Sequence, residues 1–67
     1  MGRMRNWNII DRINGQVCTQ VQAQNGKSAV RKFRQGLLSS GIYWIEQQED
    51  GWHLISSYGS DFHAVEM

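Results

Sequence analysis

Cysteine and proline are almost absent from this chain of 67 residues, which contains one cysteine and no proline. A single cysteine excludes an intramolecular disulfide, so no covalent cross-link supports the fold. The cysteine and the two histidines also lack the paired spacing of a structural zinc site, and the sequence therefore predicts no metal and no cofactor. Because so short a chain builds a core of marginal stability, we expect either very good packing or self-association as a homodimer.

Long apolar segments are absent as well. No run approaches the roughly 18 residues that a membrane-spanning helix requires, and the positively charged start is not followed by the apolar stretch of a signal peptide. The simplest expectation is a cytoplasmic protein with a reduced thiol. Three tryptophans, two tyrosines and two phenylalanines can form a core, so we expect one domain over residues 1–67, with residues 1–6 as a flexible basic arm.

Basic residues are absent from the second half of the chain. Seven of them lie at or before position 34 against one acid, whereas five acids and no lysine or arginine follow. The basic residues are Arg3, Arg5, Arg12, Lys27, Arg31, Lys32 and Arg34. Such a division indicates a charged partner or two copies that meet through opposite charges, but the two halves can equally neutralise each other within one fold.

The pattern of apolar residues indicates strands on both sides of a helix. Alternating or β-branched segments predict strands, and apolar residues recurring every three or four positions predict a helix. The predicted strands are 7–13, 17–23, 42–48 and 52–58, the predicted helix is 27–38, and residues 61–67 form either a short fifth strand or a docked arm. This order indicates an α+β fold of ββαββ type, in which an antiparallel sheet of four or five strands carries the helix on one face. It does not determine the strand order.

Glycine-containing turns set the expected register of the two hairpins. Gly15 is expected in the left-handed position of a three-residue loop, while Asp50 and Gly51 are expected to form a two-residue type I′ turn. The expected pairs are Trp7–Val21, Ile9–Thr19 and Asp11–Val17 in the first hairpin, and Tyr43–Tyr58, Ile45–Ser56 and Gln47–Leu54 in the second. The second register leaves Trp44 on the outer face of the sheet, beside His53.

The predicted helix has an apolar side and recognisable ends. Its apolar residues fall within one arc of about 120°. They are Ala29, Val30, Phe33, Gly36 and Leu37. Asn25 is the expected N-cap and Gly41 the expected stop. Gly36 costs about 1 kcal/mol in a helix interior relative to alanine, and on the apolar side it would allow the helix to approach the sheet closely.

The segment Gly26-Lys27-Ser28 lies between a predicted strand and the predicted helix, where a phosphate-binding loop would lie. The full nucleotide-binding pattern also needs a glycine five residues before Gly26, where this chain has Val21, so that pattern is excluded. The amides at the helix N-terminus, together with Lys27 and Ser28, can still hold one anion. The alternative is an ordinary capped helix start.

A second candidate site is the polar side of the helix, where three basic residues fall within about 60° of one another. Together with the basic arm they suit the phosphate backbone of a nucleic acid, and an exposed tryptophan can stack on a base. The candidate nucleic-acid-binding residues are Arg3, Arg5, Lys27, Arg31, Arg34 and Trp44. The leading hypothesis is therefore a small binding or regulatory module that binds nucleic acid, and the opposing interpretation is an ordinary solvated helix face.

The alternative hypothesis is a protein-interaction module or homodimer that uses an exposed sheet edge or the face carrying Trp44. For catalysis, side chains such as Cys18, His53, His63 and Asp61 can be combined on paper, but their spacing singles out no nucleophile and base. The sequence therefore predicts no catalytic residue and no enzyme.

Overall fold

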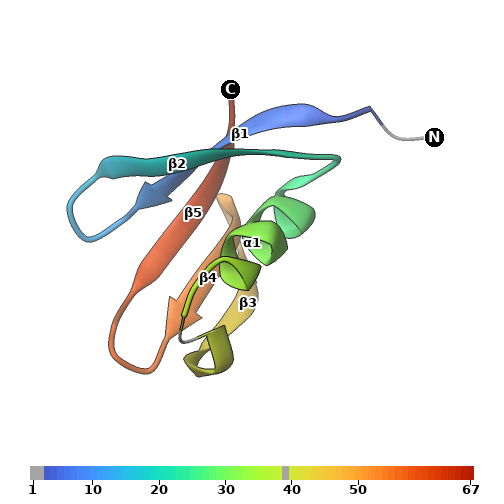
Figure 1. Ribbon diagram of the computed structural model, residues 1–67. Coiled ribbons are helices and arrows are strands. Elements are labelled where there is room, and N and C mark those ends of the chain that lie inside the picture. Colours follow the sequence, from blue (N-terminus) through green and yellow to red (C-terminus); the bar gives the residue numbers. More distant parts are fainter. Residues whose placement is uncertain (1–2, 39) are drawn as a thin grey trace.

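The chain folds into one antiparallel sheet with an α-helix on one of its faces (Figure 1). The computed structural model describes residues 3–38 and 40–67. Its elements are β1 (Arg5–Asp11), β2 (Gln16–Ala23), α1 (Gly26–Gln35), the short 3-10 helix η1 (Ser40–Ile42), β3 (Tyr43–Gln48), β4 (Gly51–Ser56) and β5 (Asp61–Glu66). The α+β class and the ββαββ order are confirmed, and the tail is a fifth strand. No helix in the described ranges is long and apolar enough to cross a membrane.

β5 lies in the middle of the sheet, between the two hairpins (Figure 1). The strand order is β2-β1-β5-β4-β3, so β2 and β3 form the two edges. β5 pairs with β1 along almost its whole length, but with β4 only from the His53–His63 pair to the Ile55–Asp61 pair. The two hairpins are therefore joined to each other through β5.

The core lies between the sheet and the apolar side of α1. Ile9, Leu54 and Ala64 of the sheet and Ala29 and Val30 of the helix are buried. Phe33 and Leu37 pack against this cluster, as the predicted apolar arc requires. The side chain of Asn25 accepts a hydrogen bond of 2.9 Å from the Ser28 N–H, which confirms the predicted N-cap.

α1 ends earlier than predicted, at Gln35, and Gly36 is its C-cap. Gly36 is exposed, so the expected close approach at this glycine and the expected stop at Gly41 are both wrong. The close approach occurs instead at Gly26, the first residue of the helix. A Cβ atom there would lie 3.1 Å from Cδ1 of Trp52, so the helix start rests directly on that indole.

The first hairpin follows the predicted register until a β-bulge interrupts it. Trp7–Val21 and Ile9–Thr19 are paired as predicted, and Gly15 has the predicted positive φ of 75°. The register then shifts, so that Ile10 instead of Asp11 pairs with Val17. The predicted Asp11–Val17 pair and three-residue loop are therefore wrong, because the bulge places one extra residue, Cys18, in β2.

The second hairpin is shifted by two residues from the predicted register. The observed pairs are Tyr43–Ser56, Ile45–Leu54 and Gln47–Trp52, and Gln48 pairs with Gly51. Glu49 and Asp50 therefore make the turn, and Gly51 (φ 125°) begins β4. A shift of two residues keeps every side chain on its expected face, but it leaves Tyr58 beyond the strand and 82% exposed.

The face of the sheet opposite α1 is open. Trp44 lies on this open face, as predicted, because its neighbours Tyr43 and Ile45 point into the core. Its side chain is 45% exposed. The open face is not uniformly solvated, however, since His53 on the same face is completely buried.

Candidate functional site

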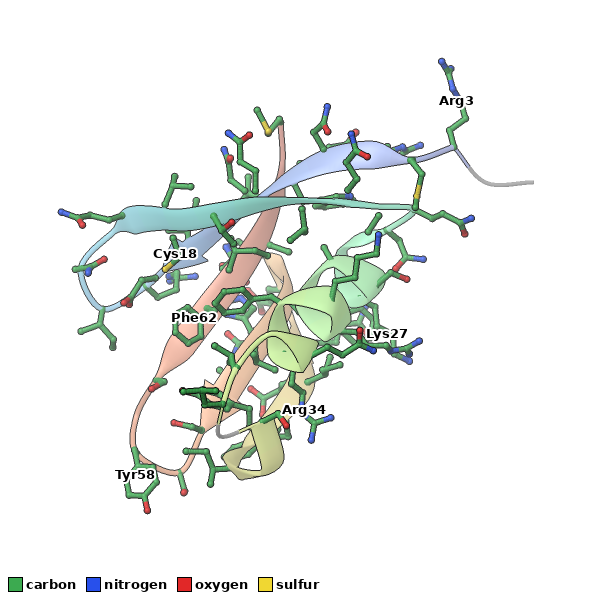
Figure 2. All side chains as sticks on the ribbon, viewed as in Figure 1. Arg3, Cys18, Lys27, Arg34, Tyr58 and Phe62 are labelled. Atoms are coloured by element: carbon green, nitrogen blue, oxygen red, sulfur yellow. The ribbon has the colours of Figure 1, made fainter. Side chains whose placement is uncertain are left out.

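α1 carries four basic residues and no acid. They are Lys27, Arg31, Lys32 and Arg34; Lys27, Arg31 and Arg34 share its outward side, whereas Lys32 donates a hydrogen bond to the backbone carbonyl of Gln22 in β2. Figure 2 shows the side chains of Lys27 and Arg34 extending from this helix. Because like charges on one short helix repel one another, such a surface is costly to the isolated fold and suits an anionic partner.

The predicted basic residues of the helix differ in how firmly they are held. The Nζ atom of Lys27 lies 5.3 Å from the centre of the Trp52 ring, a cation–π distance. The Nε atom of Arg34 donates a hydrogen bond of 3.0 Å to the carbonyl oxygen of Ser40. Arg31 is exposed to solvent between them. Arg31 is therefore the residue whose charge is most directly available to a partner.

The basic residues of the predicted N-terminal arm, Arg3 and Arg5, lie in or next to β1 and not on α1. Arg5 and Asn6 belong to β1, whereas Arg3 and Met4 precede the strand and residues 1–2 lie outside the described ranges. Arg5 pairs with Glu66 across the sheet at 3.4 Å, with both side chains about half exposed. An exposed ion pair of this kind contributes little to stability, so Arg5 can exchange its partner at small cost.

Trp44 does not join the basic helix. It lies on the open face, on the other side of the sheet from α1. The predicted set of nucleic-acid-binding residues is therefore divided between two surfaces. The aromatic residue that the fold places beside the helix cations is Trp52, under Lys27. Trp52 lies on the helix side of the sheet, where it is half-buried against the core.

In the predicted anion-binding segment Gly26–Ser28, the backbone N–H groups at the helix start are largely taken by hydrogen bonds to the N-cap residue Asn25. The Ser28 N–H is taken by the side chain of Asn25, and the Ala29 N–H donates to the Asn25 carbonyl at 3.0 Å. Gly26 is buried beneath Trp52 and Trp7. Of the three predicted residues, only Lys27 offers an exposed group, so this segment favours the ordinary capped helix start.

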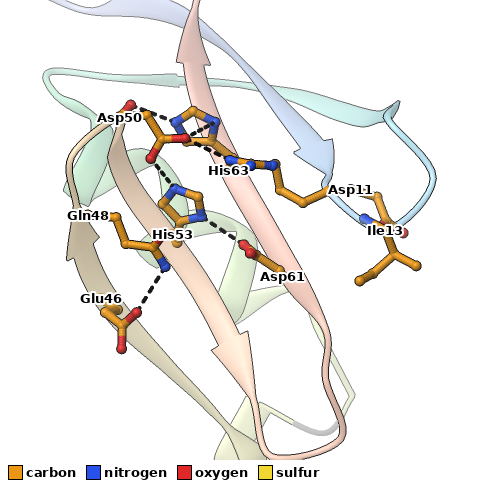
Figure 3. A network of polar contacts seen from close by, with 9 residues as sticks. Asp11, Ile13, Glu46, Gln48, Asp50, His53, Asp61 and His63 are labelled. Carbon is orange, nitrogen blue, oxygen red and sulfur yellow. Dashed lines mark hydrogen bonds and ion pairs between the residues drawn. The ribbon is translucent and has the colours of Figure 1, made fainter.

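A cluster of titratable side chains occupies the open face around His53 (Figure 3). The Nδ1 atom of His53 lies 2.7 Å from Oδ1 of Asp61, and its Nε2 atom lies 2.7 Å from Oδ1 of Asp50. Carboxylates accept hydrogen bonds, so both ring nitrogens donate only when the ring is a protonated imidazolium. The cluster therefore holds a buried positive charge between two carboxylates.

The pKa values of this cluster agree with that assignment. Burial alone lowers the pKa of His53, but its hydrogen bonds to Asp61 and Asp50 and their negative charges outweigh burial and raise the pKa above 6.5. The hydrogen bond from His53 lowers the pKa of Asp50 from 3.8 to about 2, although desolvation opposes it. Arg12, whose Nη1 lies 2.7 Å from Oδ2 of Asp50, lowers this pKa further.

His63 completes the cluster by stacking on His53. The ring centroids are 4.3 Å apart and the rings are nearly parallel, with an interplanar angle of 8°. Nε2 of His63 donates a hydrogen bond of 2.8 Å to the carbonyl oxygen of Asp50. The turn between β3 and β4 is thus held to β5 by the backbone carbonyl of Asp50, and Oδ2 of the Asp50 side chain also lies 3.8 Å from Nδ1 of His63.

Asp50, His53 and His63 also bring three potential metal ligands within 4.8 Å of one another. The lone pairs of imidazole nitrogens lie in the ring planes, so two rings that bind one ion must point their planes at it. Stacked, parallel rings do not converge in this way. Both nitrogens of His53 are also engaged with carboxylates. The arrangement fits a hydrogen-bonded ion cluster better than a metal centre.

Sequence reasoning missed this cluster although two local signals were present. Asp50 precedes His53 by three residues across the turn, and Asp61 and His63 alternate on one face of β5. The missing information was the central position of β5, which alone places Asp61 and His63 beside His53. His53 was correctly expected on the outer face, but its burial by its own polar neighbours was not.

A cleft of about 370 Å³ opens where β4 and β5 separate, near the N-terminus of α1. Its walls include Trp7 and Trp52, and Gly26, Asp50 and Glu66 also line it. No family of proteins, no curated protein and no solved structure matches this chain. Function must therefore be inferred from these three surfaces: the basic side of α1, the His53 cluster and the cleft.

Proposed function

We propose that this chain is a small non-enzymatic binding or regulatory module that binds nucleic acid through the outward side of α1. The observation that carries the proposal is the composition of that helix, which has four basic residues and no acid. Lysine and arginine side chains on one surface release the counterions of a phosphate backbone, which favours binding to nucleic acid.

The positions of the acids support the proposal. Glu46, Asp50 and Asp61 project from the open face, on the other side of the sheet from α1. Asp50 pairs with Arg12, and Glu66 pairs with Arg5. None of the ion pairs in the described ranges involves a basic residue of α1. The acids of the open face thus leave the helix charge in place.

The His53 cluster supports a non-enzymatic reading. A general acid or base must reach its substrate, whereas His53 is completely buried and both its nitrogens already contact carboxylates. The cluster holds the β3–β4 turn to β5, which is a structural role.

Arg31→Ala is expected to weaken binding to fluorescent DNA and RNA, and to lower the slope of log affinity against log salt by about 0.9. The charge of Arg31 is exposed on the helix, so its loss removes one phosphate contact without disturbing the core. Anisotropy titrations at about 50 and about 200 mM salt measure both quantities.

Gln20→Glu is the matched control for that titration. It lowers the net charge by the same amount, but on an exposed position of β2 that pairs with Asn8, away from the outward side of α1. Equal losses in the two variants would mean that net charge alone drives binding, and no binding of the native chain at the lower salt would overturn the proposal.

A second candidate function, self-association, is favoured by Trp44. This large aromatic side chain is 45% exposed on the open face, and aromatic residues of this kind anchor protein interfaces. The partner in this case would be a second copy of the chain or another protein.

Trp44→Ser is expected to shift a self-associating protein toward the monomer mass of 7.7 kDa, because it removes the apolar anchor. Light scattering over a range of protein concentrations measures the mass. A native chain that stays at the monomer mass at every concentration would exclude the homodimer.

A further inference from the structure

The cleft between β4 and β5 arises because the two strands part. The last pair that joins them is His53–His63, and within the described ranges Gly51 and Trp52 have no partner on β5. β5 continues beside β1 up to Glu66. The result is an opening of about 370 Å³ with one wall from β4 and the other from β1 and β5.

Two tryptophans line this opening. The Nε1 of Trp7 donates a hydrogen bond of 3.0 Å to the carbonyl oxygen of Ala23, which fixes its ring. Gly26 lies beside both rings, since a Cβ atom there would be 3.1 Å from Cδ1 of Trp52 and 3.5 Å from Cζ3 of Trp7. Neither ring is fully buried, although both touch the core. Two positioned, accessible aromatic surfaces are what a planar ring needs in order to stack.

The polar groups at the cleft are complementary to one class of planar ligand. Glu66 lines it with a carboxylate that is about half exposed and held only by the long contact to Arg5. Asp50 also lines it, but its two oxygens already contact His53 and Arg12. Glu66 is therefore the available acceptor, and a carboxylate accepts hydrogen bonds from the amino and ring N–H groups of a base.

A cation stands at the rim of the same cleft. Lys27 is exposed, and its Nζ lies 5.3 Å from the centre of the Trp52 ring. A phosphate attached to a base stacked in the cleft would lie near this ammonium group. The cleft and the basic side of α1 thus meet at Lys27.

We propose that the cleft between Trp7 and Trp52 binds one unpaired nucleobase, with guanine preferred, and that Lys27 holds the attached phosphate. Guanine is preferred because its ring N–H and its amino group are adjacent donors that a single carboxylate, Glu66, accepts together. Uracil presents one donor and two carbonyl oxygens, which the carboxylate repels. This inference rests on the proposed function, and it specifies a strand with an unpaired base as the partner of the helix.

The test is calorimetric titration of the whole chain with GMP and with UMP at about 50 mM salt. We expect GMP to bind about tenfold more tightly than UMP. Equal affinities for the two nucleotides, or no measurable binding of GMP, would overturn the assignment.

Two variants locate the binding within the cleft. Gly26→Ala places a Cβ in the cleft, 3.1 Å from Trp52 and 3.5 Å from Trp7, so GMP binding should weaken. Gly41→Ala is the matched control, because its Cβ would meet nothing within 4 Å, and binding should persist. If Gly26→Ala does not fold, Glu66→Gln decides the question, since it leaves the ring in place and should abolish the preference for GMP over UMP.

The two proposals fail in different ways. Loss of the salt-dependent binding to long strands in Arg31→Ala tests the helix, whereas the nucleotide preference tests the cleft. Selective GMP binding that Arg31→Ala leaves intact supports the cleft even if long strands do not bind, and strand binding without nucleotide selectivity supports the helix alone and overturns the cleft.

Discussion

Replacing His53 with alanine is expected to lower the free energy of unfolding by about 3 kcal/mol, most of the stability that a domain of this size usually has. The imidazolium lies 2.7 Å from both Asp50 and Asp61, and without it the two carboxylates face a cavity with no shared counter-charge. We expect the lower end of the range for buried ion pairs, because both carboxylates remain partly exposed to water. Urea unfolding, monitored by tryptophan fluorescence, measures the difference.

Gln48→Ala serves as the control for this substitution. Its side-chain amide also donates to a carboxylate, at 2.9 Å from Glu46, but both groups are exposed. Its removal should change stability by less than about 0.5 kcal/mol. A small effect of His53→Ala, similar to that of the control, would mean that the cluster does not hold β4 to β5.

The contribution of the cluster to stability is expected to be greatest between about pH 4 and pH 6.5. The pKa of Asp50 is lowered from 3.8 to about 2 in the folded chain, so its contribution is complete above 3.8 and is lost as the pH falls through 2. The pKa of His53 is raised above 6.5, so its contribution is complete below 6.5 and is lost as the pH rises through the folded-state value. The urea midpoint should therefore decline on both sides of this window.

His53→Ala provides the comparison for the alkaline side of the profile. Because the variant lacks the titrating ring, its urea midpoint should change much less than that of the native chain as the pH rises from about 6.5 to about 8.5. Parallel profiles for the two proteins would show that another group causes the alkaline decline.

The side on which most residues lie was predictable, because burial of one face gives the apolar residues a regular spacing along a strand or a helix. Val17 is an exception, since the bulge moves it from the predicted face to the open face, where it pairs with Ile10. Val30 and Phe33 mark the helix side that meets the sheet, and Tyr43 and Trp44 mark opposite faces of β3. The register of the hairpins was less predictable. In the first hairpin, no glycine near Cys18 indicates the bulge in the sequence. In the second hairpin, the turn is formed by Glu49 and Asp50 instead of Asp50 and Gly51.

The turn of the second hairpin depends on contacts that lie far away in the sequence. Asp50 binds Arg12, which lies 38 residues away, and its carbonyl oxygen accepts from His63, 13 residues away. A rule based on the local pair Asp50-Gly51 cannot include these partners. The same limit applies to the His53 cluster and to the cleft, both of which depend on the position of β5 in the sheet.

The basic side of α1 was predictable from spacing alone, since helical residues three or four positions apart share a side. The identity of the aromatic residue beside these basic residues was not predictable. Trp44 was the better candidate by its exposed face, yet Trp52 is the ring that lies beside Lys27. Whether an aromatic residue is near a helix depends on packing across the sheet, which no local pattern records.

The central position of β5 has a consequence for the order of folding. Each hairpin closes a short loop and can form early, but two-stranded hairpins are marginally stable in water. The strand that joins them pairs Trp7 with Glu66, almost the full length of the chain apart. The entropy cost of closing such a long loop arises before the contacts of β5 stabilise the fold. We therefore expect folding to be slow for a protein of this size and limited by the insertion of β5. The hairpins should then become stable, and the His53 cluster and the cleft should form, in one cooperative step.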